Sequence, residues 1–267
     1  MSRLATRFEQ LKSQQRKALV SYVMAGDPHP QVTVPLLHQM VEAGVDVVEL
    51  GLPFSDPMAD GPVIALAAER ALAGGSSTLD ALNMVKEFRE KDQTTPVVLM
   101  GYLNPVEVIG YEKFVAYAKE CGVDGVLLVD LPPEESKQFG DVLKQNEMDQ
   151  IFLLAPTSTD KRIQHVVNQA SGFVYYVSLK GVTGAATLDT SEAAARIAKI
   201  KSMTNVPVGV GFGISDAASA KAMGQVADAV IVGSAFVKSF ATLPAVEAVQ
   251  QTVNKVKELR AALDELV

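Results

Sequence analysis

The sequence contains few of the residues that build disulfides or metal clusters. Cys121 is the single cysteine among 267 residues, so the chain can form neither an internal disulfide nor a thiolate metal cluster. Only three histidines are present, His29, His38 and His165, and their wide spacing argues against a histidine metal site. We therefore expect no metal in the function of this chain.

Long apolar runs and basic clusters are also missing. No apolar run approaches the roughly 18 residues that a membrane-spanning helix needs. The N-terminal stretch MSRLATRFEQLKSQQ is charged and amphipathic, without the apolar segment of a signal peptide. The net charge is -7, with no Lys/Arg cluster, which disfavours a nucleic acid or an acidic membrane surface as partner. We expect a soluble, cytoplasmic protein.

Hydrophobic residues make up 48% of the chain, and they are arranged as alternating short β-branched runs and longer helical stretches. Eight such units predict one (β/α)₈ TIM barrel over residues 1–267, with an extra N-terminal helix and long loops after the second and sixth strands. An open, doubly wound sheet is the alternative, and eight evenly spaced units fit it less well. The predicted strands are Lys17–Met24, Val45–Leu50, Pro96–Met100, Gly125–Val129, Gln150–Leu154, Phe173–Val177, Val206–Val210 and Ala229–Val232.

Two glycine-rich turns, GFGIS and GSA, follow the seventh and eighth predicted strands. Barrel active sites lie at the C-terminal ends of the strands, and phosphate commonly binds after strands seven and eight. Glycine allows the backbone to approach a ligand, and the next helix begins with unpaired N–H groups. The alternative is tight-turn geometry alone. The phosphate candidates are Gly211, Phe212, Gly213, Gly233 and Ser234.

Two carboxylates follow the second strand. Glu49 ends a buried run, where a charge is costly unless it has a task or a partner, and Asp60 comes eleven residues later in a loop. Carboxyls in different environments can act as acid and base. The alternatives are a buried residue with a backbone or Lys partner for Glu49, and helix capping ahead of Pro62 for Asp56 and Asp60. Asp27 and Asp130 also end strands, where a turn role is as plausible as catalysis.

Large side chains at or near strand ends could line an aromatic-sized pocket between the carboxylates and the phosphate candidates. Plain core packing is the alternative for each of them. The sixth loop, which contains Gly181-Val182-Thr183-Gly184, could reach in as a further contact. The pocket candidates are Tyr22, Met100, Tyr102, Tyr175 and Phe212.

The strings ELGLPFSDPMADGP (49–62), GVTG (181–184), GFGIS (211–215) and GSA (233–235) together resemble the tryptophan synthase alpha subunit family. The resemblance extends over essentially the whole chain. It implies a lyase of tryptophan biosynthesis that cleaves indole-3-glycerol phosphate to indole and glyceraldehyde 3-phosphate. It also implies an alpha2beta2 complex with a beta subunit that consumes the indole. Pyridoxal phosphate is expected only in that partner, and no cofactor in this chain.

The resemblance also implies roles for single residues. Glu49 matches the general acid/base of the family and Asp60 its second catalytic carboxylate. Tyr22 and Met100 stand where some members carry Phe and Leu, and Leu179-Lys180 replaces an Arg-Ala of others. The residues that match the phosphate-binding positions of the family are Gly184, Gly213, Gly233 and Ser234, with Phe212 beside them. Tyr175 and Thr183 match residues near the substrate. The segments that resemble the docking face for the beta subunit are those around Asp56, Asn104 and Pro132.

Retro-aldol cleavage of this substrate needs a proton on indole C3 and removal of a proton from the side-chain hydroxyl. A carboxyl at Glu49 can supply the first proton, and an anionic Asp60 near the ring N–H can stabilise the growing positive charge. Two other functions are considered. Lys180 could act as the nucleophile of a Schiff-base aldolase, or the chain could be a binding module that activates a partner subunit.

Overall fold

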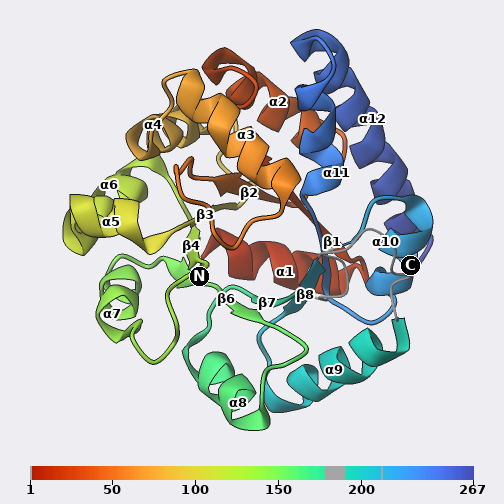
Figure 1. Ribbon diagram of the computed structural model, residues 1–267. Coiled ribbons are helices and arrows are strands. Elements are labelled where there is room, and N and C mark those ends of the chain that lie inside the picture. The colour runs from red at the N-terminus through yellow and green to blue at the C-terminus, as the bar shows by residue number, and fades with distance from the viewer. Residues whose placement is uncertain (1, 178–189, 212) are drawn as a thin grey trace.

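A parallel β-sheet forms the centre of the molecule (Figure 1). The computed structural model describes residues 2–177, 190–211 and 213–267. The hydrogen-bonded order of the strands is β5-β4-β3-β2-β1-β9-β8-β7-β6. The strands are β1 (Ala18–Met24), β2 (Val47–Gly51), β3 (Val97–Gly101), β4 (Gly125–Leu128), β5 (Asp149–Gln150), β6 (Phe152–Leu154), β7 (Val174–Val177), β8 (Val208–Gly211) and β9 (Ala229–Val232).

The first and last strands in this order, β5 and β6, together occupy one strand position of the barrel. β5 pairs with β4 and β6 pairs with β7, and only Ile151 separates the two halves in the chain. The Ile151 N–H still donates to the Val126 carbonyl at 3.0 Å. The sheet is therefore a nearly closed barrel of eight strand positions, which confirms the predicted fold class. The prediction of one continuous strand over Gln150–Leu154 was wrong, because pairing changes from β4 to β7 at Ile151.

Helices surround the barrel, as the alternating pattern predicted (Figure 1). In the described part of the chain, no helix is both long and apolar enough to cross a membrane. The helices are α1 (Arg3–Ser13), α2 (Pro30–Glu42), α3 (Pro62–Ala73), α4 (Thr78–Arg89), α5 (Leu103–Ile109), α6 (Tyr111–Cys121), α7 (Lys137–Gln145), α8 (Asp160–Gln169), α9 (Thr190–Met203), α10 (Ala217–Gly224), α11 (Ser234–Val237), the 3₁₀ helix η1 (Lys238–Ala241) and α12 (Ala245–Asp264).

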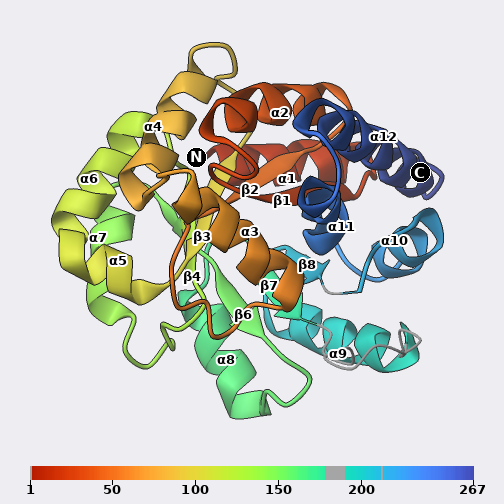
Figure 2. The same cartoon turned by 45° about the horizontal axis from the view of Figure 1, so that its top comes forward.

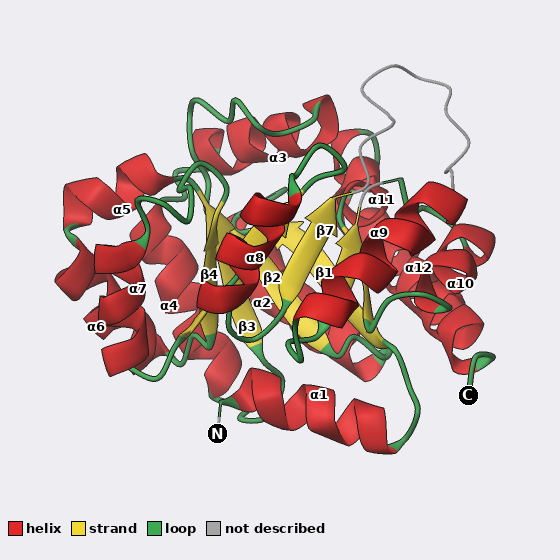
Figure 3. Ribbon diagram, turned by 90° about the horizontal axis from the view of Figure 1, so that it is seen from below, coloured by secondary structure: helices red, strands yellow, loops and turns green. Residues whose placement is uncertain are grey.

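Helix α1 lies across the N-terminal ends of the strands, opposite α3 (Figure 3). Its residues Leu4, Phe8 and Leu11 are buried and pack with the inward-facing side chains of the barrel, such as Val20 and Ile151. This apolar cluster fills the barrel interior from α1 up to Tyr175 and Ile231, which line the cavity near the C-terminal strand ends. The C-terminal strand ends form the upper half of the barrel, and α3 lies over this half in the tilted view (Figure 2).

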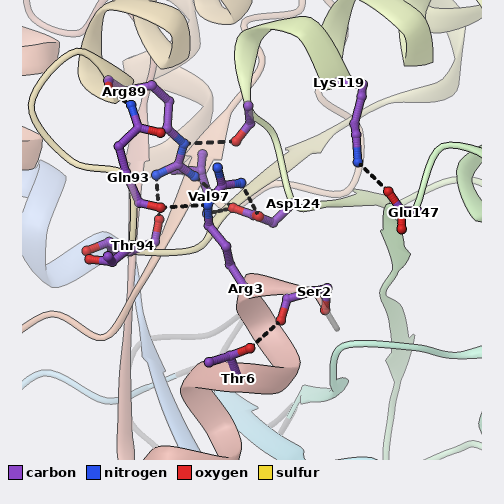
Figure 4. A network of polar contacts seen from close by, with 12 residues as sticks. Ser2, Arg3, Thr6, Arg89, Gln93, Thr94, Val97, Lys119, Asp124 and Glu147 are labelled. Carbon is purple, nitrogen blue, oxygen red and sulfur yellow. Dashed lines mark hydrogen bonds and ion pairs between the residues drawn. The ribbon is translucent and has the colours of Figure 1, made fainter.

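Buried ion pairs tie strands and helices together at the N-terminal end of the barrel (Figure 4). Asp124 accepts hydrogen bonds from the Val97 N–H at 2.8 Å, from Arg89 at 2.7 Å and from Arg3 at 2.9 Å. Asp46 and Asp228 bond in the same way to the backbone N–H groups of neighbouring strands. Polar groups at this end of a barrel serve stability, since active sites lie at the other end.

Three short elements differ from the predicted pattern. Helix α5 was not predicted, and its first N–H, that of Leu103, donates to the Asp130 carboxylate at 2.8 Å. The sequence pattern predicts a helix over Glu134–Lys144, but helix α7 begins at Lys137, where the Ser136 hydroxyl donates to the Pro133 carbonyl and closes a turn ahead of it. Helix α11, directly after β9, was also not predicted.

Candidate active site

A cavity of about 240 Å³ lies at the C-terminal ends of the strands, under the start of α3. Several of its lining residues come from segments far apart in the sequence, and the barrel brings them together. The predicted site residues that line it are Tyr22, Glu49, Asp60, Met100, Tyr175, Gly213, Gly233 and Ser234. The lining residues that the sequence did not single out are Gly61, Ile64, Ile214, Ser215, Ile231 and Ala235.

Glu49 is the one carboxyl of the cavity that lies wholly inside the protein. It follows Val47 by two residues on β2, so strand alternation turns it toward the barrel interior. Its exposed fraction is 0%, and neither carboxyl oxygen has a hydrogen-bond partner among the described residues. Burial raises the pKa of Glu49 from its ordinary value of 4.5 to about 8. No described residue is therefore the backbone or Lys partner of the alternative, and a pKa of about 8 keeps Glu49 mostly protonated at pH 7.

Two tyrosines extend across the upper barrel over glycines of the neighbouring strand. A Cβ built on Gly51 would lie 2.3 Å from the Tyr22 hydroxyl oxygen, and one built on Gly211 would lie 2.3 Å from that of Tyr175. Any larger residue at either glycine would displace the ring. Burial raises the pKa of both phenols well above the usual range, so both are neutral hydrogen-bond donors.

Asp60 lies in the loop between β2 and α3, and Tyr102 holds this loop. The Tyr102 hydroxyl accepts a hydrogen bond from the Ala59 N–H at 2.9 Å, and its ring lies 5.4 Å from that of Phe54. Burial raises the pKa of Asp60, and a side-chain hydrogen bond with Tyr102 counteracts part of the rise. The residue before α3 is Gly61, which makes no side-chain cap, so helix capping does not explain Asp60.

The phosphate candidates lie at the ends of β8 and β9. Gly213 has a φ of +74°, a conformation that favours glycine. Ser234 and Ala235 begin α11, so their N–H groups have no acceptor within the helix. Neither a lysine nor an arginine occurs among the described residues that line the cavity, so an anion here would bind to N–H and hydroxyl groups.

Other predicted residues are not part of this cavity. Asp27 accepts two hydrogen bonds from Arg70, at 2.7 and 2.9 Å, and so joins the turn after β1 to α3. Asp130 caps α5, as described above. Both therefore have structural partners. Thr183, Gly184 and Phe212, together with the alternative nucleophile Lys180, lie outside the described residues.

The described residues include no group of three or more His, Cys, Asp or Glu side chains that could hold a metal ion. The chemistry available in the cavity is therefore that of one neutral carboxylic acid, one partly buried carboxyl, and phenol and backbone donors. Such a set can donate a proton to an apolar ring, stabilise a cation and bind an anion.

The family model described as "Tryptophan synthase alpha chain" matches residues 8–267. The chain belongs to the tryptophan synthase alpha chain family. This membership places it in tryptophan biosynthesis and confirms the resemblance of its loop motifs.

Relatives in the tryptophan synthase alpha chain family agree over their full length. The tryptophan synthase alpha chain of Acinetobacter baumannii is 90% identical over 267 residues, with 100% of both chains covered. That of Psychrobacter cryohalolentis is 56% identical, again with 100% of both chains covered. The crystal structure of tryptophan synthase subunit alpha from Legionella pneumophila superimposes with a TM-score of 0.92 at 42% identity, covering 99% of each chain.

The lining residues that the sequence did not single out are small or apolar. Ile231 lies on β9, two residues before the predicted site residue Gly233. The period of two of a strand could therefore have predicted that the Ile231 side chain faces the barrel interior. Ser215 and Ile214 belong to the GFGIS turn and could have been included with its glycines. Gly61 and Ile64 line the cavity because α3 lies over the barrel, which no local pattern indicates.

Proposed function

We propose that the chain cleaves indole-3-glycerol phosphate to indole and glyceraldehyde 3-phosphate by retro-aldol chemistry. The observation that carries the proposal is a fully buried Glu49 that has no hydrogen-bond partner among the described residues and shares one cavity with Asp60. A buried carboxyl without a partner is costly, and a catalytic acid is a reason to retain it. Family membership supports the same reaction.

In this proposal Glu49 is the acid. At pH 7 a carboxyl with a pKa of about 8 is mostly protonated, so it can give its proton to indole C3. The ring then carries a positive charge on the nitrogen, next to the Asp60 carboxylate. The Glu49 carboxylate can then accept the proton of the hydroxyl on the glycerol side chain of the substrate. As this proton leaves, the carbon–carbon bond breaks and the aldehyde forms. The electrons of the broken carbon–carbon bond return to the ring and restore indole.

The rest of the cavity would orient the substrate. Tyr22, Met100 and Tyr175 would border the indole ring, because they are large side chains that line the cavity. The phosphate would accept hydrogen bonds from backbone N–H groups at Gly213, Gly233 and Ser234, with the Ser234 hydroxyl beside them. Gly184, Thr183 and Phe212 remain predicted contacts from the segments outside the described residues. No metal or other cofactor is assigned to this chain.

We propose a tryptophan synthase beta subunit as the partner, in an alpha2beta2 complex, with pyridoxal phosphate only in that subunit. Met58, in the loop before α3, and Val108, on α5, are 79% and 82% exposed. Both side chains lie on segments that follow strands at the C-terminal end of the barrel, and exposed apolar side chains there favour a protein partner. The predicted docking segments around Asp56 and Asn104 include or adjoin these two residues, and the third predicted segment lies around Pro132. Indole would pass to the partner, and the complex would act in the cytoplasm.

The proposal is tested by measuring indole release from indole-3-glycerol phosphate, with and without added beta subunit. We expect slow release by the chain alone and a large gain in the complex, as ordering of loops often limits such reactions. Glu49→Gln and Asp60→Asn should each lose about 10²–10⁴-fold in kcat while the fold is kept. The exposed carboxyl of Glu69 provides the control Glu69→Gln. Near-normal turnover in either site variant contradicts that assignment.

The same assay gives a pH profile. Because Glu49 acts as an acid with a pKa of about 8, activity should fall as the pH rises through about 8. A profile that is flat from pH 7 to 10 would contradict the role of Glu49 as proton donor.

A further inference from the structure

Helix α3 lies over the cavity, and its apolar packing restrains its position only weakly (Figure 2). The first turn of α3 and the two residues before it supply Asp60, Gly61 and Ile64 to the lining of the cavity. A buried methyl group removes little apolar surface from water and makes few contacts, so it fixes a helix less firmly than a large side chain does. The fully buried side chains of α3 are all alanines: Ala67, Ala68 and Ala71.

One ion pair gives α3 a contact of defined geometry. Arg70, in the last turn of the helix, donates from Nε and Nη2 to the two carboxyl oxygens of Asp27, at 2.7 and 2.9 Å. The Asp27 side chain is only 1% exposed. Because a bidentate pair sets both the distance and the orientation of its partners, it limits how far α3 can slide or turn.

The turn after β1, which carries the carboxyl of this pair, is itself fixed to the barrel. The Ala25 N–H donates to the Gly51 carbonyl at 3.0 Å, and the Gly26 N–H donates to the Thr33 hydroxyl oxygen at 2.9 Å. Gly26 has a φ of +87°, and a Cβ built on it would lie 2.0 Å from the Ser76 Oγ. The turn therefore lies directly against the residues that follow α3.

We propose that Arg70 and Asp27 are positioning residues for the indole ring. Their ion pair fixes α3 over the cavity, so that Ile64 covers the ring and Asp60 meets its nitrogen. This inference rests on the proposed function, in which the ring lies between Glu49 and Asp60. Neither partner of the pair lines the described cavity, so both act through the helix. A shift of about 1 Å in the groups that orient a substrate can lower the rate about 100-fold.

The test is Arg70→Gln, which removes the charge and the bidentate contact and keeps a polar side chain. Two probes are compared by calorimetry: an uncleavable indole-alkyl phosphate, and propyl phosphate, which has no ring. The affinity for the indole-alkyl phosphate should fall about tenfold, since the ring loses part of the cover of one apolar side chain. The affinity for propyl phosphate should stay within about twofold, because the phosphate candidates lie at the ends of β8 and β9. The kcat of cleavage should fall about 10- to 100-fold.

Arg89→Gln is the matched control. It breaks the buried ion pair with Asp124, 2.7 Å long, at the opposite end of the barrel, so it lowers stability without a change at α3. Both probes should bind to it as they bind to the wild-type chain. A selective loss of the indole-alkyl phosphate in Arg89→Gln would overturn the proposal. Equal weakening of both probes in Arg70→Gln, or weakening of neither, would overturn it too.

A second variant keeps the test valid if thermal melting shows that Arg70→Gln is unfolded. Asp27→Asn keeps the shape of the side chain and removes the buried charge, and it should show the same selective loss. Where both single variants fold, the double variant should lose little more affinity than either one, because the two residues act as one unit. Losses that multiply would reject the inference. Failure of the wild-type chain to bind the indole-alkyl phosphate would instead reject the proposed function, so the two failures can be told apart.

Discussion

Replacing Glu49 by Gln should stabilise the fold while it abolishes the acid. The carboxyl is fully buried without a partner among the described residues, and its pKa rises from 4.5 to about 8. At pH 7 the unfolded chain releases this proton and the folded chain keeps it. The difference lowers the stability of the native state by about 3 kcal/mol. A glutamine has no proton to release, so the variant avoids this loss.

The sign of the effect depends on pH in a defined way. Below pH 4.5 the carboxyl is protonated in both states, and burial causes no pH-linked loss. Between 4.5 and about 8 only the unfolded state ionises, so the native state loses stability as the pH rises. The advantage of Glu49→Gln should grow from about 1 kcal/mol at pH 5 to about 4 kcal/mol at pH 8.

Urea unfolding at pH 5 and pH 8 measures this difference for the wild-type chain, Glu49→Gln and the exposed control Glu69→Gln. The packing of the glutamine amide contributes equally at both pH values, so the change between the two pH values is the quantity that matters. A difference that is equal at both pH values would refute the reasoning, because the Glu49 carboxyl would then not be buried as a neutral acid.

Two further changes test the packing of the barrel. Gly51→Ala should lower the cleavage rate about 10- to 100-fold, because the added Cβ would lie 2.3 Å from the Tyr22 hydroxyl and displace the ring. The control Gly74→Ala should keep the rate, because its Cβ would meet ordinary contacts at 3.4 Å. Equal rates for both variants would contradict the close approach of Tyr22 to Gly51. Arg89→Ala should cost about 3 kcal/mol in urea unfolding, because it removes a buried partner of Asp124, and a loss below about 1 kcal/mol would contradict this assignment.

Much of the barrel follows from local sequence patterns. The period of two in VVELG turns Val47 and Glu49 inward and Val48 and Leu50 toward the helices, as the structure has them. The division of the fifth strand at Ile151 could not be predicted, since the four residues from Ile151, IFLL, form a continuous apolar run. It depends on where the barrel closes, which is a property of all the strands together.

The site was predictable in its residues more than in its interactions. The apolar run before Glu49 indicated its burial, but the lack of a partner within the described part of the chain depends on which side chains the other strands bring opposite it. The same is true of Asp27 and Arg70, which lie 43 residues apart and meet only when α3 packs against the turn after β1. Helix α5 was missed because its cap, Asp130, comes from the end of another strand.

The central claim is that one cavity binds an indole ring between Glu49 and Asp60 and a phosphate at the ends of β8 and β9. A crystal structure with an uncleavable indole-alkyl phosphate tests it most directly. We predict phosphate oxygens within hydrogen-bond distance of the N–H groups of Gly213 and Ser234, the ring nitrogen at Asp60, and C3 next to the Glu49 carboxyl. A ligand bound with its phosphate elsewhere, or with C3 away from Glu49, would contradict the account.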